Sequence, residues 1–337
     1  MIIVFDTNIW KSEVYLQSPS AAAVRFFLRE QKARVALPEV VRLEVEEHLR
    51  GHIKSVISKL REQHGRLLRL FGQLRELSLP AEDAIDKVIA KVFGELGVEV
   101  IDVPFSFPSA RSSFLKTIRK VPPSDRTQEF KDGVLWSNCV ELLEIDDVCL
   151  ITNDSAFYAN HEVARGLAPE LAAELIGKPH RLTIMARLSD LLKQVRVDYD
   201  ISVETISEQL LLGSREWPVA QLARNGFSLG EIKAAERRLF ATENPQMVFV
   251  EFQVVYEYPD LTDAERSPAT LTIKGDGTYD AETGVFRDHR ILSETIQFRG
   301  EDAEQELRNS IIYAEGLVIG QKEVKNTIRY AIQERSG

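Results

Sequence analysis

The chain has 337 residues, of which 44% are hydrophobic and 28% are charged, and its formal net charge is −10. This length predicts two domains, and the composition is typical of a globular protein that can bury a sizeable core. Apolar runs of the 18 or more residues that span a bilayer are absent, and the N-terminus lacks a basic leader, so we expect a cytoplasmic protein without a membrane anchor.

The first 195 residues alternate between strand-like and helix-like segments. Short apolar, β-branched runs predict strands at 2–5, 34–37, 98–103, 147–152 and 181–185. Helically spaced apolar residues predict helices at 19–31, from Pro38 to about 77, and at 81–96, 109–119, 125–144 and 161–175. This alternation predicts an α/β fold with a Rossmann-like parallel sheet flanked by helices.

The pattern changes after residue 195. The stretch 196–240 predicts short helices broken at Trp217-Pro218 and Asn225-Gly226, which together form a helical connector. Alternating apolar and polar residues then predict antiparallel strands at 248–258, 269–274, 284–286, 294–298 and 311–319. Turns are expected at Gly275-Asp276-Gly277 and Glu282-Thr283-Gly284. We therefore expect a domain at 1–195, the connector at 196–240, and a smaller antiparallel α+β module at 241–337.

Four acidic residues stand out in the first domain. Asp6 and Asp154 each follow an apolar run, so we expect them at the carboxyl ends of strands, where open α/β sheets form their ligand crevice. Glu44 and Asp132 fall in helix-like stretches. If the four converge on one pocket, their like charges require compensation, and divalent cations with oxygen ligands are the usual source.

This ordered set resembles the PIN-domain family of ribonucleases over roughly residues 1 to 195. The resemblance is carried by the strand ending in Asp6-Thr7-Asn8, by Glu44, by Asp132 with Trp136 one turn later, and by Thr152-Asn153-Asp154 with Phe157 following. It implies an endoribonuclease in which the four acids are catalytic and bind one or two Mg²⁺ or Mn²⁺ ions. Around these ligands, we expect Asn8, Thr152 and Asn153 to hydrogen-bond the carboxylates or water.

The distribution of charge is consistent with an RNA substrate. Residues 1–200 carry 27 basic and 29 acidic residues, whereas residues 201–337 carry 15 and 23. Because phosphate affinity comes from lysine and arginine, we expect substrate contacts from the basic residues upstream of Asp132, namely Arg119, Lys120, Arg126 and Lys131. The acidic C-terminal module would repel a phosphate backbone, so we expect it to bind a protein partner or regulator, or a second copy of the chain.

Other interpretations remain open. Asp154 could serve merely as a helix cap, and Asp132 could lie in the first turn of its helix merely because the helix dipole favours a carboxylate there. Other glutamates on the helix of Glu44 could take its place as the ligand. A haloacid-dehalogenase-type phosphatase would want a second Asp two residues after Asp6, where Asn8 stands. A catalytically inactive PIN-like scaffold is the third alternative.

Two further segments resemble metal-binding motifs, and the chain has two cysteines. Glu44, His48 and His52 could share a helix face for zinc, although the zincin order is absent. The glycines around Asp276 have a calcium-loop character, but Arg287 stands where a bidentate Glu would close the loop. Cys139 and Cys149 are expected as buried free thiols.

Overall fold

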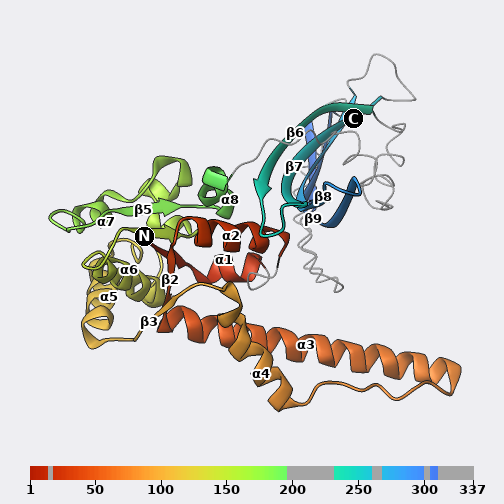
Figure 1. Ribbon diagram of the computed structural model, residues 1–337, viewed down its shortest axis with the longest axis horizontal. Helices are drawn as coiled ribbons and strands as arrows, with labels where there is room; N and C mark the ends of the chain where they lie inside the picture. The colour runs from red at the N-terminus through yellow and green to blue at the C-terminus, as the bar shows by residue number, and fades with distance from the viewer. Residues whose placement is uncertain (14–17, 196–230, 260–267, 300–303, 310–337) are drawn as a thin grey trace, which may run out of the picture. The chain divides into compact units, whose positions relative to one another are not determined.

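The computed structural model describes residues 1–13, 18–195, 231–259, 268–299 and 304–309 (Figure 1). Contacts between Cα atoms divide the chain into two compact units, Met1–Leu16 with Phe27–Leu191 and Gln17–Phe26 with Leu192–Gly337. Each unit contains one five-stranded sheet. None of the described helices is long and apolar enough to cross a membrane.

The first unit is built on a parallel sheet flanked by helices, as predicted. Its strands, in chain order, are β1 (Ile2–Phe5), β2 (Arg34–Pro38), β3 (Val100–Val103), β4 (Val148–Ile151) and β5 (Leu182–Met185). They lie in the order β3-β2-β1-β4-β5, and all four pairings are parallel. The chain therefore adds strands on one side of β1 and then on the other, which places a topological switch point between β1 and β4.

The helices of this part of the chain are α1 (Thr7–Ser12), α2 (Pro19–Glu30), α3 (Glu39–Phe71), α4 (Glu82–Val92), α5 (Phe107–Arg119), α6 (Phe130–Leu142), α7 (Pro169–Ala173) and α8 (Leu188–Leu191). Short 3₁₀ turns lie at η1 (Gly94–Leu96), η2 (Ser155–Phe157), η3 (Ala159–His161), η4 (Val163–Arg165) and η5 (Leu192–Val195). The long helix α3 continues beyond the sheet, and α4 packs against it (Figure 1).

The core of the first unit follows from the apolar strands. Ile3 and Val4 on β1 are fully buried, because this strand lies between two neighbours and is covered by helices. Trp10 on α1 packs edge-on against Phe5 and Phe93, with ring centroids 5.8 and 5.0 Å away. Cys139 and Cys149 are buried free thiols, as expected.

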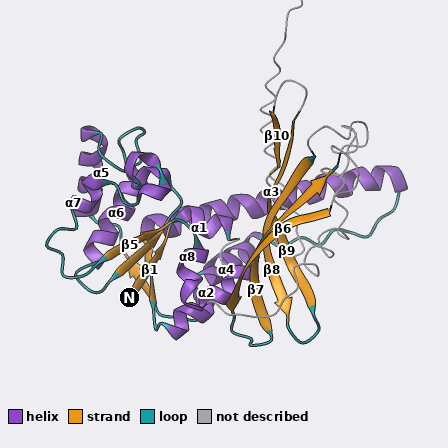
Figure 2. Cartoon of the chain, turned by 90° about the horizontal axis from the view of Figure 1, so that it is seen from above, coloured by secondary structure: helices purple, strands orange, loops and turns teal. Residues whose placement is uncertain are grey.

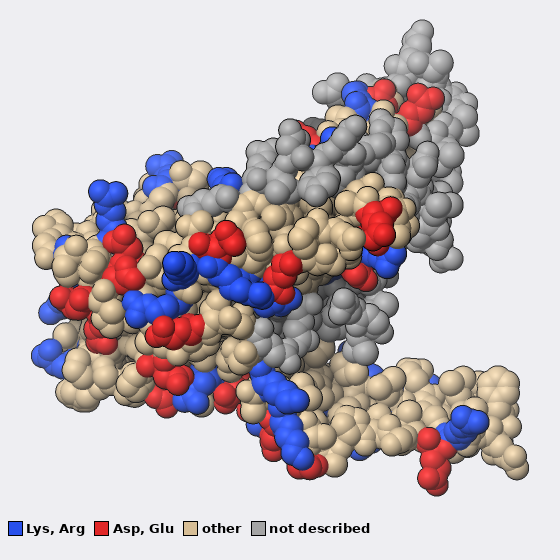
Figure 3. All heavy atoms as spheres, viewed as in Figure 1, with Lys and Arg blue, Asp and Glu red and all other residues tan. Residues whose placement is uncertain are grey.

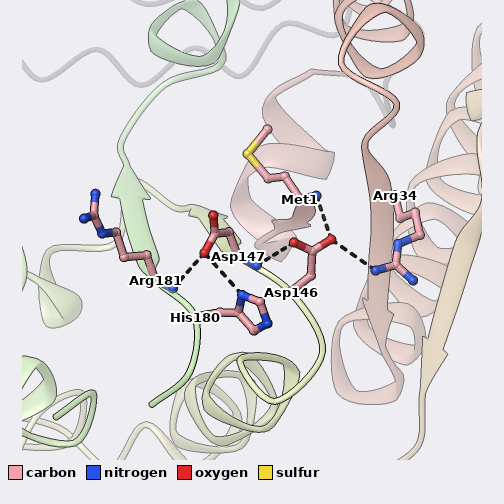
Figure 4. A network of polar contacts seen from close by, with 6 residues as sticks. All are labelled: Met1, Arg34, Asp146, Asp147, His180 and Arg181. Atoms are coloured by element: carbon pink, nitrogen blue, oxygen red, sulfur yellow. Dashed lines mark hydrogen bonds and ion pairs between the residues drawn. The ribbon is translucent and has the colours of Figure 1, made fainter. Parts of the chain in front are cut away.

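A polar network fixes the amino ends of the strands (Figure 4). Asp146 accepts hydrogen bonds from the Met1 amino group at 2.7 Å and from Arg34 at 3.2 Å. The hydrogen bond from this amino group lowers the pKa of Asp146 to about 2. Beside it, Asp147 accepts from the backbone N–H of Arg181 at 2.9 Å. These contacts lie opposite the carboxyl edge of the sheet, where Asp6 and Asp154 follow their strands.

The second unit carries an antiparallel sheet, which Figure 2 shows among the orange strands. Its strands are β6 (Glu231–Ala241), β7 (Met247–Tyr258), β8 (Ala269–Asp280), β9 (Val285–Arg299) and β10 (Glu304–Asn309), in the order β10-β9-β8-β7-β6. The alternation along β7 buries Val250, Phe252 and Val254 in a cluster with residues of β8 and β9. Asp276 on β8 is opposite Arg290 on β9, and their side chains form a buried ion pair.

Several predicted elements are wrong in extent or type. The helix expected at 161–175 is reduced to 3₁₀ turns and the short α7, and the helix expected from 125 begins at Phe130. The end of the expected helical connector, residues 231–240, lies in strand β6. The glycines at 275 and 277 lie inside β8 rather than in a turn, and the segments 284–286 and 294–298 fall in one strand, β9. The strand expected at 311–319 and the connector up to 230 lie outside the described residues.

Candidate active site

Asp6 lies at the switch point, and its carboxylate does not cap the helix that follows. Its backbone N–H donates to the carbonyl oxygen of Ile151 at the end of β4, at 3.0 Å. Its own carbonyl oxygen accepts from Ile9 and Trp10, which starts α1, but the side chain makes no capping hydrogen bond. The carboxylate is therefore available for other contacts, although the residue is only 4% exposed.

Thr152 connects the ends of β1 and β4. Its hydroxyl donates to Asp6 Oδ2 at 2.6 Å and accepts from the backbone N–H of Asp154 at 3.1 Å. Asn8 Nδ2 contacts the same Asp6 oxygen at 3.4 Å. Asp154 also caps η2, since its Oδ1 accepts from the N–H of Ala156 at 2.8 Å. Capping and a place beside the other acids are thus compatible for Asp154.

Glu44 lies on α3 and is held by three side chains. Thr7 donates to its Oε2 at 3.2 Å, and Lys131 donates to its Oε1 at 2.7 Å. Lys11 Nζ lies 3.7 Å from the same Oε1. Two lysines from α1 and α6 therefore supply the positive charge that this glutamate faces.

The electrostatics couple all four acids. Burial, and after it the charges of Asp6, Asp154, Glu129 and Glu44, together raise the pKa of Asp132 to about 8. Burial also raises the pKa of Asp6, and the charges of Asp154 and Glu44 raise it too. The hydrogen bond from Thr152 lowers this pKa but does not outweigh burial. Each shift requires the acids to lie within Coulombic range in a partly dehydrated place.

Glu44 differs from the two aspartates in the sign of its shift. Burial raises its pKa, but the hydrogen bond from Lys131 and the charges of Lys131 and Lys11 outweigh this effect, so the pKa lies below its usual range. Glu44 is therefore an ionised member of the cluster, whereas Asp132 holds its proton at neutral pH when no cation is bound.

The oxygen ligands of this site are chemically suited to a hard divalent cation, but they are not arranged as a complete coordination sphere. Carboxylate and hydroxyl oxygens from Asp6, Asp132, Asp154 and Thr152 are ligands of the kind that Mg²⁺ and Mn²⁺ prefer. The described residues, however, contain no group of three or more His, Cys, Asp or Glu side chains placed closely enough to hold a metal ion. This also leaves the zinc interpretation of Glu44, His48 and His52 without support.

The residues expected to bind substrate are only partly brought together. Lys131 contacts Glu44, whereas Arg119 and Lys120 are exposed at the end of α5 and Arg126 is exposed in the loop before α6. Asn153 is also exposed. Basic and acidic side chains are interspersed over the face shown in Figure 3. The structure thus connects one of the four basic residues to the acids.

Two residues that contact Glu44 were not predicted. Thr7 directly follows Asp6, and Lys11 comes four residues later on α1. Residues four apart on a helix share one face, so this spacing is a signal that could have indicated both. The contact between Lys131 and Glu44 joins residues 87 positions apart and has no comparable local signal.

Comparison with known proteins gives one match. Residues 3–157 match the family model described as PIN domain. Neither the curated proteins nor the solved structures gave a match. The matched range runs from β1 to η2 and contains all four acids. The N-terminal part of this chain is therefore a PIN domain, a member of a family of nucleases.

Proposed function

We propose that the PIN domain hydrolyses RNA phosphodiester bonds as a divalent-metal-dependent endoribonuclease. The observation that carries the proposal is the Thr152 hydroxyl, which joins the Asp6 carboxylate to the backbone of Asp154 at the switch point of the parallel sheet. The charges of Asp6, Asp154 and Glu44 also act on the pKa of Asp132. Acids that raise one another's pKa in a partly dehydrated place cost the folded protein stability, so a bound cation is the natural reason for the arrangement.

Each side chain has a proposed role. Asp6, Asp132 and Asp154 would hold one or two Mg²⁺ or Mn²⁺ ions, with Glu44 completing the set. A divalent ion held there polarises the phosphoryl oxygen and lowers the pKa of the attacking water. Thr152 orients the Asp6 carboxylate through its 2.6 Å hydrogen bond. Lys131 and Lys11 hold Glu44 and offer positive charge to a phosphate.

RNA is the proposed substrate, and the second unit is proposed to act elsewhere. Its part of the sequence is acidic, so it would oppose phosphate contact. We assign it to binding a protein partner, a regulator or a second copy of the chain, and place no metal ligand in it.

The substitution Asp6→Asn tests the proposal. Asparagine keeps the size and the hydrogen bond from Thr152 but removes a charge, so cleavage of a short labelled RNA in Mn²⁺ should fall at least ~100-fold. The melting temperature in EDTA should stay unchanged or rise, because like-charge repulsion is relieved. Asp102→Asn on β3 is the matched control, since this aspartate is exposed.

The outcomes separate the alternatives. RNA cleavage that EDTA abolishes and Mn²⁺ restores supports the nuclease. Hydrolysis of a phosphomonoester instead of RNA would support the phosphatase. Neither activity in the parent protein would leave the inactive scaffold, in which Lys131 and Lys11 neutralise Glu44 permanently.

A further inference from the structure

A pocket of about 700 Å³ opens beside Glu44 within the first unit. Glu44, Lys11 and Lys131 line it, so it shares these three residues with the candidate active site. Its other walls come from the beginning of α3 and from Phe105, which follows β3. The pocket therefore continues along the carboxyl edge of the sheet, from the switch point toward β2 and β3.

Two large apolar side chains are left uncovered in this pocket. Phe105 is 50% exposed and Leu43 is 53% exposed, and both line it. The backbone N–H of Phe105 donates to Glu39 Oε2 at 2.8 Å, which fixes the segment that carries the ring. A half-exposed aromatic ring on a backbone held in this way, next to the candidate active site, offers a flat face for an unstacked base.

The polar groups of the pocket favour one kind of base edge. Glu39 and Glu47 line it, and an ionised carboxylate only accepts hydrogen bonds. The two lysines of the pocket, Lys11 and Lys131, both face Glu44. Apart from His48, whose ring can donate or accept, the edge that a base meets here is therefore rich in acceptors. Adenine, cytosine and guanine carry an amino donor, whereas uracil offers a single ring N–H between two carbonyl oxygens.

We propose that this pocket binds one unstacked nucleobase of the substrate strand, stacked on Phe105 and read by the carboxylates of Glu39 and Glu47. It prefers a base with an amino group over uracil. This inference rests on the proposed nuclease function, because it places the base of the nucleotide next to the scissile phosphate. Lys131, which lines the pocket and contacts Glu44, would then contact the phosphate that joins the two sites.

The test is a binding measurement that does not require cleavage. The full chain is titrated in EDTA with labelled pentanucleotides of RNA, UUAUU, UUCUU, UUGUU and UUUUU, and fluorescence anisotropy is recorded. The three pentanucleotides with a central amino base should bind at least about 5-fold more tightly than UUUUU, as expected for one added hydrogen bond to a charged group. Phe105→Ala should weaken binding of these three by about 5- to 150-fold, the effect of losing one base stack, and Phe105→Trp should restore it.

Two control variants distinguish a loss of base binding from a loss of folding and from the removal of any exposed side chain nearby. Phe107→Ala removes an aromatic ring that is 77% exposed two residues away and does not line the pocket, so its affinities should match those of the parent. Glu47→Gln introduces a donor and should reduce the preference against UUUUU, while its melting temperature stays unchanged.

The failures are distinguishable. If Phe105→Ala is folded and binds all four pentanucleotides as the parent does, or if the parent binds none of them, the pocket is not a base site. A parent that cleaves RNA while Phe105→Ala binds unchanged overturns this inference alone. A parent that shows the predicted binding pattern but never cleaves in Mn²⁺ overturns the nuclease proposal and leaves the pocket in place.

Discussion

Asp132 carries the proton that makes the metal-free domain sensitive to pH. In the folded chain its pKa is raised to about 8, first by burial and then by the charges of Asp6 and Asp154, from a reference value of 3.8. Between these two values the unfolded chain has released the proton and the folded chain keeps it. The folded state therefore binds more protons, so its stability falls as pH rises from about 4 to about 8 and changes little above.

The size of this effect follows from the pKa difference. One pKa unit corresponds to about 1.36 kcal/mol, so at pH 7 the three units above the unfolded value set an upper limit of about 4 kcal/mol. Asp132 is partly exposed, and solvent screening reduces the effect to about 2 kcal/mol. Asp132→Asn removes the titrating group and should gain this amount at pH 7, or roughly 4–8 °C in melting temperature for a unit of this size.

The assay is thermal unfolding in EDTA at pH 5, 6, 7 and 8, for the parent, Asp132→Asn and the control Asp102→Asn. The parent and the control should lose stability over this range, and Asp132→Asn should lose much less. With Mn²⁺ added the order should reverse, because a ligand that binds only the folded state stabilises the parent. A variant that melts below the parent at pH 7 in EDTA, or that keeps the parent's pH slope, would refute the reasoning.

Two further predictions concern packing and a buried ion pair. Gly133→Ala places a Cβ 2.3 Å from Ser113 Oγ where α5 meets α6, so it should destabilise the first unit by about 1–3 kcal/mol. The control Gly51→Ala on α3 has nothing within 4 Å of the added Cβ and should stabilise the unit by about 0.5–1 kcal/mol. Equal shifts in melting temperature for both variants would contradict the close contact. Arg290→Met leaves the buried Asp276 without the arginine that donates to its Oδ1 at 2.7 Å and should cost about 3–5 kcal/mol in chemical denaturation. Arg287→Met removes an exposed guanidinium that pairs with Asp280 and should have a much smaller effect. A mild Arg290→Met phenotype would show that the pair is dispensable.

The strands, and the positions of Asp6 and Asp154 after two of them, were predictable because their signals are local. An apolar, β-branched run such as Ile2–Phe5 can be buried on both faces only in the middle of a covered sheet, and parallel topology then brings the residue after each strand to one edge. The interactions around Glu44 were not predictable in this way. Which lysine meets it depends on how α1, α3 and α6 pack, and chain spacing does not determine that.

The glycines of β8 show a signal that was interpreted wrongly. A Cβ at Gly275 would lie 2.6 Å from the Phe252 ring, and one at Gly277 would lie 2.5 Å from the Phe286 ring. These glycines make room for aromatic rings on neighbouring strands, and the register shifts beside both of them. The missing helix at 161–175 has a local cause, since Asn160, His161 and Gly166 have positive φ and Pro169 starts a new helix.

The division of the chain has a consequence for its synthesis. The first part of α2, up to Phe26, groups with residues from Leu192 onward, and Arg25 contacts Glu243 at 3.4 Å. The ribosome makes the early segment long before its partners, because more than 160 residues separate Phe26 from Leu192. At 5–20 residues per second, the early segment waits roughly 8 to 33 s for the chain that covers it. During that interval apolar side chains of the segment such as Val24, which is buried in the folded chain, lack these partners and are open to chaperones and to other nascent chains.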